Sequence, residues 1–305
     1  MREAATVLLL RQHAGALEVL MMRRGTGLSF MAGMWVFPGG RMDEADQSPA
    51  ALARLLPETR DRCAGELRSL RGERLPPEAA LGLRIAACRE AFEEAGVLLA
   101  LTREGAPCDA GLVAKLQPLR AEVASDARAF IRMLEQEDLY LDLGPLVYWS
   151  HWITPSLEPK RFDTRFFVVP VPVEQSVSAD LSELTEHAWV NPANAPAAIA
   201  RGEIRVVPPT LLTLEDLAES FARHGDLRAL LRAEAGRPTP PVMPRIEVLA
   251  ESVRVVMPWD ATYGQVPGEG CAAGDAYPPH FTRRRSSLTV SRQREVQQKS
   301  EGPDR

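Results

Sequence analysis

No segment of the sequence is apolar enough, over a sufficient length, to cross a membrane. The apolar run at the N-terminus covers only Ala4–Leu10 and then ends in charge. It is too short for a membrane span, which needs about 20 apolar residues, and it does not form a signal peptide. The sequence therefore predicts a soluble protein with no membrane partner.

Cysteine is scarce, and neither sign of charge dominates. The four cysteines, Cys63, Cys88, Cys108 and Cys271, show neither metal-ligand spacing nor a small disulfide framework. We expect free thiols in a reducing compartment, with Cys88 buried on the apolar side of a helix. The 36 basic and 41 acidic residues give a net charge of −5, which does not steer the whole molecule toward nucleic acid. A local basic pocket for phosphates remains compatible with this balance.

Apolar residues make up 45% of the sequence, enough for a substantial core. Residues 5–10 and 16–24 flank a turn-like segment and predict an antiparallel hairpin. A strong helix is expected over residues 78–96, with two prolines at its start and Gly96 at its end. The remaining pattern predicts further strands and helices over residues 34–37, 145–154, 161–172, 186–192, 194–203 and 210–225. Strands and helices are mixed along the chain, so the fold class is α/β or α+β.

The composition changes near the C-terminus. After about Gly264 the chain is rich in Gly, Pro, Ser, Arg and Gln and has few apolar residues to pack. We therefore expect one folded domain over residues 1–264 and a disordered tail over residues 265–305.

Three acidic residues, Glu90, Glu93 and Glu94, crowd the end of the long predicted helix. With roughly 100° per residue they share one face. The opposite face is apolar and carries Leu81, Ile85, Cys88 and Phe92. Like charges at this spacing repel and weaken a helix by a few tenths of a kcal/mol per pair. A hard divalent cation such as Mg²⁺ would offset that repulsion, and a merely solvated acidic face is the alternative.

The segment around these acids resembles the signature of the Nudix hydrolase family. REAFEEAGV, at Arg89–Val97, matches R-E-U-x-E-E-x-G-U, where U is a bulky aliphatic or aromatic residue. The signature opens with G-x5-E, and Gly40 with Asp46 resembles that half, with Asp in place of Glu. Arg89 follows Gly40 by 49 positions where the uninterrupted signature has 14, so about 35 residues are inserted.

This interruption, together with FPGGRMDEAD and WITPSLEPKRFDTRFFV, is similar to one branch of the family. That branch contains the peroxisomal coenzyme A diphosphatase of animals and its bacterial relatives. The resemblance covers roughly residues 4–262 and implies a Nudix fold, an α/β/α sandwich with a mixed β-sheet. It places one helical insertion at residues 47–82, inside the signature, and a second at about residues 105–143.

The resemblance also implies a metal site for Mg²⁺ or Mn²⁺. Arg89 would hold the glutamates in place through charge-assisted hydrogen bonds. The role of Asp46 stays open between metal ligand and structural pairing, since its side chain is one methylene shorter than that of Glu. The expected ligands are the Gly40 carbonyl and the side chains of Glu90, Glu93 and Glu94.

The implied reaction is hydrolysis of a diphosphate, in which a carboxylate takes a proton from the attacking water. That base is either a glutamate of the signature, Glu93 or Glu94, or an acid on a later segment, Glu186 or Glu183. His187 is expected to be a surface or strand residue and not a catalyst.

Basic residues should grip the phosphates, and a local ion pair with Asp163 is the alternative for two of them, Arg161 and Arg165. The aromatic residues Trp149, Trp152 and Phe162 could stack on a base, although core packing is favoured for at least two of them. The expected substrate-binding residues are Arg23, Lys160, Arg161 and Arg165.

The sequence thus predicts a metal-dependent enzyme whose first substrate candidate is coenzyme A or an acyl-CoA. Hydrolysis of ADP-ribose or a dinucleotide is the alternative. A non-catalytic Nudix module that senses a nucleotide is an alternative of another class, which the three retained glutamates disfavour. The expected partner is a small nucleotide, and the sequence does not predict the oligomeric state. The chain ends in GPDR, without the Ser-Lys-Leu peroxisomal address, so a cytoplasmic location is expected.

Overall fold

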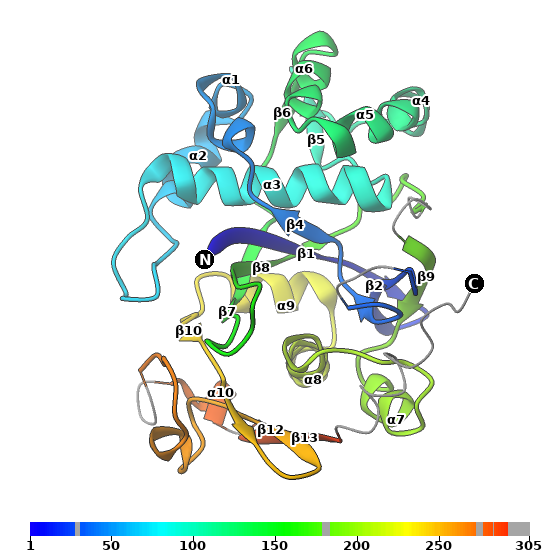
Figure 1. Ribbon diagram of the computed structural model, residues 1–305. Helices are drawn as coiled ribbons and strands as arrows, with labels where there is room; N and C mark the ends of the chain where they lie inside the picture. The colour runs from blue at the N-terminus through cyan, green and yellow to red at the C-terminus, as the bar shows by residue number, and fades with distance from the viewer. Residues whose placement is uncertain (28–30, 179–183, 273–276, 283, 292–305) are drawn as a thin grey trace, which may run out of the picture.

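A mixed β-sheet divides the molecule into an upper and a lower layer (Figure 1). The computed structural model describes residues 1–27, 31–178, 184–272, 277–282 and 284–291. The main strands follow the order β10 (Pro241–Val242), β7 (Val147–Ile153), β8 (Phe162–Pro170), β1 (Arg2–His13), β2 (Ala16–Arg24) and β3 (Trp35–Val36). Two further strands join the sheet: β1 pairs with β4 (Gly39–Arg41), and β2 pairs with β9 (Leu184–Val190). Parallel β1–β8 and β7–β10 pairs stand among antiparallel ones, which confirms the expected mixed sheet.

The predicted hairpin is confirmed as β1 and β2. Its turn residues, Ala14 and Gly15, both have positive φ, 49° and 79°. This two-residue turn suits the twist of antiparallel strands. The middle of β1, Val7–Leu10, is fully buried because both faces of the sheet are covered. The strand β4 pairs with the N-terminal half of β1, so the Pro-Gly-Gly turn lies against the body of the sheet.

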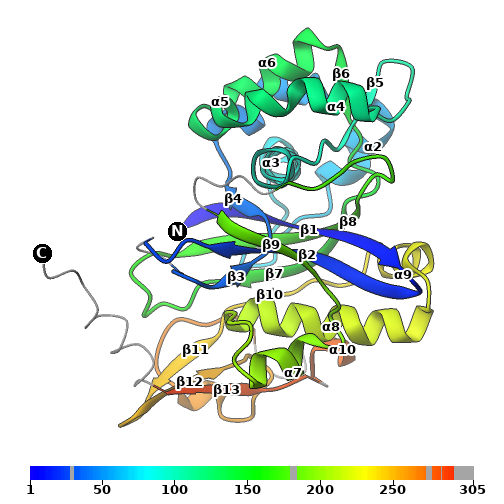
Figure 2. The same ribbon diagram turned by 90° about the vertical axis from the view of Figure 1, so that its right-hand side faces the viewer.

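The long predicted helix is α3 (Pro77–Ala95), and it lies on the upper face of the sheet (Figure 1). Sequence periodicity predicted one buried and one open face, but 14 of its 19 residues are buried. The reason is that helices of the two insertions cover the side of α3 that faces away from the sheet (Figure 2). Cys88 is buried in this upper core as predicted, and burial raises the pKa of its thiol.

Both predicted insertions belong to the upper layer. A short helical turn, η1 (Glu44–Gln47), leads into the first, which carries α1 (Pro49–Leu52) and α2 (Pro57–Ala64). The second carries α4 (Ala110–Leu116), η2 (Gln117–Leu119), α5 (Arg120–Ser125) and α6 (Arg128–Gln136). A two-stranded ribbon of β5 (Ala100–Thr102) and β6 (Leu139–Leu141) flanks the second insertion.

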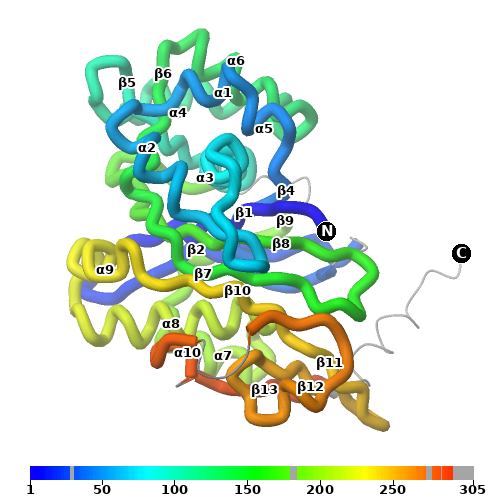
Figure 3. The backbone as a smooth tube through the Cα atoms, turned by 90° about the vertical axis from the view of Figure 1, so that its left-hand side faces the viewer, coloured from blue at the N-terminus to red at the C-terminus, as the bar shows by residue number. Residues whose placement is uncertain are grey.

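The lower layer combines helices with a small second sheet (Figure 3). Its helices are α7 (Ala195–Ala200), α8 (Pro208–His224) and α9 (Leu227–Glu234). The second sheet contains β11 (Arg245–Val248), β12 (Ser252–Val256) and β13 (Ser287–Ser291), and short helical turns occur at η3 (Tyr263–Gln265) and α10 (Pro279–Thr282). Trp149 and Trp152 lie in the lower core, so for these two residues the expectation of core packing holds.

The described part of the expected C-terminal tail differs from the prediction of disorder. β13 pairs antiparallel with β12, and the side chains of Tyr277 and Phe281 are buried in the lower core. Arg284 forms an ion pair with buried Asp216 of α8. A few large aromatic side chains bury enough apolar area to hold a segment whose average composition is polar. The expectation for residues 292–305 lies outside the described residues.

The α+β fold class is confirmed by this arrangement of a mixed sheet between helical layers. Within the described ranges, no helix has the length and apolar character that a membrane span requires.

Candidate active site

The last turns of α3 lie against the backbone of β4. The Gly39 N–H donates to Glu94 Oε2 at 2.9 Å. A Cβ atom at Gly40 would lie 2.2 Å from Glu90 Oε1, so only glycine allows this carboxylate to approach the strand. The two halves of the interrupted signature, about fifty residues apart in the sequence, are therefore in direct contact.

Arg89 is the centre of a buried hydrogen-bond network beneath these acids. Its Nη1 donates to Glu90 Oε1 at 2.9 Å and to Glu93 Oε2 at 3.1 Å. Its Nη2 also donates to the Arg41 carbonyl of β4, at 2.9 Å. One guanidinium thus orients two of the three glutamates and ties α3 to β4. This arrangement agrees with the orienting role that the resemblance implied for Arg89.

Asp46 uses both carboxylate oxygens on Arg89. The contacts run from Nε to Oδ1 at 3.0 Å and from Nη2 to Oδ2 at 3.1 Å. Asp46 Oδ2 also accepts from the Asp43 N–H at 2.8 Å, which completes the capping box of η1. Of the two roles that the sequence left open for Asp46, this geometry favours the structural pairing.

The carboxylates carry more negative charge than their surroundings neutralise. Burial raises the pKa of the Glu90 carboxyl to about 7, against the opposing attraction of Arg89. Burial, reinforced by neighbouring Glu90, also raises the pKa of Glu94 well above its usual range. Crowded carboxylates in a low-dielectric site favour protonation unless another cation shares the site.

The donor set fits a hard divalent cation by its chemistry, because such ions take oxygen ligands. Among the described residues, no three acidic, histidine or cysteine side chains already converge as a metal site. In this structure Glu93 Oε2 accepts from Arg89 and Glu94 Oε2 accepts from the Gly39 N–H.

A further acid candidate, Glu186, lies near the start of β9. Glu186 stands opposite Arg23 in the pairing of β9 with β2, and its Oε1 lies 2.8 Å from Arg23 Nη1. Both side chains are open to solvent, with exposed fractions of 53% for Glu186 and 39% for Arg23. His187 is an exposed strand residue, as the sequence predicted. Glu183 lies outside the described residues.

The expected phosphate-binding residues on β8 and the loop before it are not brought together. Arg165 is fully buried and contacts Asp163 and the Arg68 carbonyl, the latter at 2.7 Å, so it cannot reach a substrate without leaving the interior. The structure thus contradicts the expectation for Arg165 and favours the ion-pair alternative. Arg161 contacts Glu269 at 2.8 Å, whereas Lys160 is exposed.

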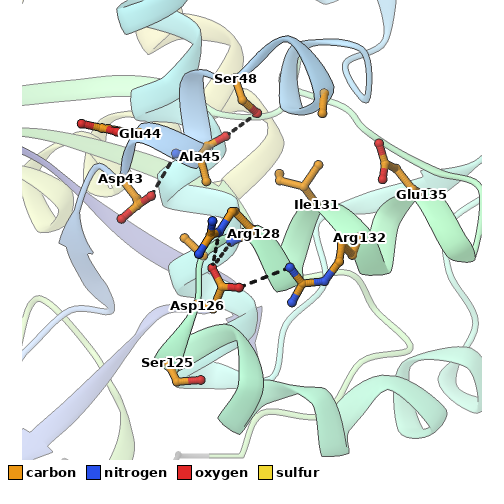
Figure 4. Close-up of a pocket in the computed structure, with 12 residues that line it drawn as sticks. Asp43, Glu44, Ala45, Ser48, Ser125, Asp126, Arg128, Ile131, Arg132 and Glu135 are labelled. Carbon is orange, nitrogen blue, oxygen red and sulfur yellow. Dashed lines mark hydrogen bonds and ion pairs between the residues drawn. The ribbon is translucent and has the colours of Figure 1, made fainter.

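A hollow of about 740 Å³ opens between the two insertions, above the start of the signature (Figure 4). Asp43 and Glu44, from the first half of the signature, line it together with Arg128 and Arg132 of α6, and both arginines pair with Asp126. None of the site residues predicted from the sequence lines this hollow.

Arg120 of α5 was missed by sequence reasoning. It donates to the backbone carbonyls of Glu93 and Glu94 at 2.9 and 2.8 Å. No side-chain pattern signals such a contact, because the acceptors are main-chain atoms and the arginine lies on a short helix of ordinary composition.

With this geometry in place, the comparisons with known proteins decide the family. Residues 1–217 match the NUDT19 Nudix domain family. The chain belongs to this family. The human acyl-coenzyme A diphosphatase NUDT19 is 32% identical over 282 residues, which cover 82% of this chain and 73% of the human protein. The relative of the same name from Xenopus laevis is 28% identical over 278 residues, 82% of this chain and 72% of that protein.

A crystal structure supports the same assignment. The Nudix hydrolase from Alicyclobacillus acidocaldarius superposes with a TM-score of 0.62 at 27% identity, covering 78% of this chain and 98% of that one. The family, fold and enzyme class expected from the interrupted signature are therefore confirmed, and the protein is a Nudix hydrolase. Enzymes of this family generally use divalent metal ions.

Proposed function

We propose that the protein hydrolyses the diphosphate of coenzyme A or an acyl-CoA with Mg²⁺ or Mn²⁺. The observation that carries the proposal is the cluster of Glu90, Glu93 and Glu94 at the end of α3. Arg89 and the glycine backbone of β4 hold these side chains in place. The name of the animal relatives supports the substrate class. The products would be 3′,5′-ADP and 4′-phosphopantetheine or its acyl form.

Glu90, Glu93 and Glu94 are the proposed side-chain ligands, with the Gly40 carbonyl as a further one. A bound divalent cation would lower the pKa of the attacking water and neutralise charge on the diphosphate. Arg89 fixes the relative orientation of two ligand side chains, because its Nη1 donates to both Glu90 and Glu93.

Glu186 is the proposed base for the attacking water, and the signature acids Glu93 and Glu94 are the alternatives. Glu186 is more exposed than Glu93, so it is open to a water on the substrate side. Arg23 sits beside it at 2.8 Å and is the proposed partner for a phosphate oxygen. Replacement of Glu186 by Gln tests this role, because turnover should fall at saturating metal while metal binding stays unchanged.

Lys160 and Arg161 remain candidates for the 3′-phosphate of coenzyme A, whereas buried Arg165 is left out. Removal of Arg161 should cost affinity for coenzyme A more than for dephospho-CoA, which lacks that phosphate. A charge-assisted contact is worth about 1.5–3 kcal/mol, or roughly tenfold to over a hundredfold in affinity. Equal loss for both compounds would reject this role of Arg161.

The experiment that tests the function is a panel of coenzyme A, an acyl-CoA, ADP-ribose and a reduced nicotinamide dinucleotide. Each is incubated with Mg²⁺ or Mn²⁺, and the products are separated by chromatography. We expect the highest kcat/KM for coenzyme A or the acyl-CoA. A preference for ADP-ribose or the dinucleotide would overturn the assignment of coenzyme A as substrate. No hydrolysis of any compound would favour a nucleotide-sensing module.

We also propose that the enzyme acts in the cytoplasm on a small nucleotide. The four free cysteines support a reducing compartment. Fractionation of cells with an antibody against the protein tests the location.

A further inference from the structure

The backbone carbonyls at the C-terminus of α3 all have partners. The last carbonyls of a helix lack intrahelical donors and must find others. Here the Val97 and Gly96 N–H groups donate to the carbonyls of Ala91 and Phe92, closing the helix with Gly96 at a φ of 69°. The carbonyls of the next residues, which include two of the proposed metal ligands, therefore need donors from outside the helix.

Those donors come from two other segments of the chain. Arg120 Nε and Nη2 donate to the carbonyls of Glu93 and Glu94 at 2.9 and 2.8 Å. Gln117 Nε2 donates to the Gly96 carbonyl at 2.9 Å, and the Ser178 N–H donates to the Ala95 carbonyl at 3.1 Å. We call this set, Gln117, Arg120 and Ser178, the helix clamp.

The members of the helix clamp also bind one another. Arg120 Nη1 donates to Ser178 Oγ at 2.9 Å and to Gln117 Oε1 at 3.2 Å. Gln117 and Arg120 belong to the second insertion, whereas Ser178 lies on the segment between β8 and β9. The end of the catalytic helix is thus fixed to the insertion above it and to the chain that leads to Glu186 (Figure 2).

Gly96 leaves the space that the helix clamp fills. A Cβ atom at this position would lie 2.6 Å from Gln117 Oε1, 3.1 Å from Ser178 Oγ and 3.2 Å from Arg120 Nη1. The glycine of the signature therefore serves two purposes here: it takes the left-handed conformation and it admits the three side chains.

We infer that Arg120 is a positioning residue for the metal site, and that the second insertion acts through it. The inference rests on the proposed metal-dependent hydrolysis. Arg120 binds the main chain of the two residues whose side chains are the proposed ligands, so a shift of the last turn displaces both carboxylates together. Its planar guanidinium reaches two adjacent carbonyls at once, and its positive charge suits the negative end of the helix.

The test compares Arg120→Gln with Arg120→Lys and with a matched control, Arg132→Gln. Arg132 belongs to the same insertion, and it pairs with Glu122 and Asp126 of that insertion at 2.7 and 3.2 Å. Binding of Mn²⁺ is measured by the decrease of the free-ion electron paramagnetic resonance signal, without substrate. Turnover of coenzyme A is measured at saturating Mn²⁺, and the melting temperature of each variant is recorded.

Arg120→Gln should weaken Mn²⁺ binding and lower kcat, each by about 10- to 100-fold, as loss of a residue that orients metal ligands does. The KM for coenzyme A should stay unchanged, and Arg120→Lys should restore part of both losses because it keeps the charge. Arg132→Gln should match the wild type in Mn²⁺ binding and in kcat. An Arg120→Gln protein that is folded and binds Mn²⁺ like the wild type overturns the inference, as does a wild type that binds no Mn²⁺.

Ser178→Ala provides a second variant in case Arg120→Gln does not fold. It removes one acceptor of Arg120 but keeps the backbone N–H that binds the Ala95 carbonyl. We expect a smaller loss of Mn²⁺ affinity in the same direction, and unchanged affinity would count against the helix clamp. The Mn²⁺ measurement needs no substrate, so failure of the coenzyme A assignment does not change what the measurement says about Arg120.

Discussion

Two clusters of buried charged side chains lie on opposite sides of the main sheet. They differ in the ratio of positive to negative side chains. The signature cluster, above the sheet, sets Arg89 against the carboxylates of Asp46, Glu90 and Glu93, with Glu94 beside them. The lower cluster sets three arginines against two acids: Arg237 contacts Asp216 at 2.6 Å and Glu234 at 3.3 Å, Arg284 pairs with Asp216, and half-exposed Arg223 contacts Glu234 at 3.5 Å.

This difference in balance separates a structural cluster from a functional one. A buried ion pair with matched charges holds elements together, and removal of one partner is strongly destabilising. A buried cluster with surplus carboxylates keeps perturbed pKa values and is completed by another cation, which is typical of active sites. The surplus above the sheet is therefore what we expect of the proposed reaction centre, whereas the lower cluster joins α8, α9 and the C-terminal segment.

The largest effect should follow from cutting the chain after Gln265. This cut removes β13, the buried Phe281 and Arg284, and leaves Asp216 with one arginine. We expect loss of the cooperative melting transition and aggregation, measured by circular dichroism and gel filtration. A cut after Ser291 is the control and should leave both measurements unchanged. A soluble, cooperative protein ending at Gln265 would show that the lower layer folds without its C-terminal part.

The next largest effect is expected for Asp216→Asn, which tests the lower cluster directly. Loss of this charge leaves Arg237 and Arg284 without their shared partner, so unfolding free energy should fall by about 3–5 kcal/mol. Urea denaturation measures that loss. Turnover well below the melting temperature should match the wild type, since α8, which carries Asp216, lies on the other side of the sheet from α3 (Figure 1). A variant with normal stability and reduced kcat would give the lower cluster a functional role.

Glu94→Gln tests the signature cluster. Here we expect turnover to fall while stability is kept, the reverse of the result expected for Asp216→Asn. Turnover at saturating Mn²⁺ should fall by about a hundredfold, equivalent to roughly 2.7 kcal/mol in the barrier. Stability without metal should not fall, because the change neutralises one of several crowded buried carboxylates. The exposed residue Glu135 of α6 supplies the control variant, Glu135→Gln. Near-normal turnover of a folded Glu94→Gln protein would remove Glu94 from the proposed metal site.

Side-chain spacing in the sequence indicated which residues of the candidate site come together in the fold. The pattern around Arg89 identified the three glutamates, and Gly40 was found because the turn before it is distinctive. Arg165 was expected to bind phosphate but is buried. The sequence alone does not show that the loop carrying Arg68 covers its face of β8. Arg120 was not predicted at all, because it acts on main-chain carbonyls that every sequence has.

The sequence predicted the individual helices and strands better than it predicted how far the folded part reaches toward the C-terminus. Alternation and turn residues predicted the hairpin, and proline and glycine predicted the bounds of α3 within one or two residues. Average composition failed for residues 277–291, where two aromatic side chains and one arginine make the decisive contacts. Contacts this sparse and this distant in sequence leave no local pattern.

The smallest expected effect is a pH dependence confined to the lower cluster. Burial and the nearby positive charges of Arg237 and Arg284 lower the pKa of His280 from 6.5 to about 4. Asp216 and Glu234, which also face it, oppose this shift. Between these two pH values the folded protein keeps His280 neutral while the unfolded chain binds a proton. Unfolding free energy should therefore decrease as the pH falls from about 6.5 toward 4.

The size of this dependence is on the order of 1 kcal/mol, because the ring is only partly buried and solvent screens its neighbours. Replacement by glutamine removes the titration, so the gap in unfolding free energy between wild type and His280→Gln should change between pH 7 and pH 5. His13, exposed on β1, supplies the control, since its replacement should leave the dependence intact. A gap that is the same at both pH values would mean that His280 binds its proton in the folded state, and that the lower cluster tolerates a further positive charge.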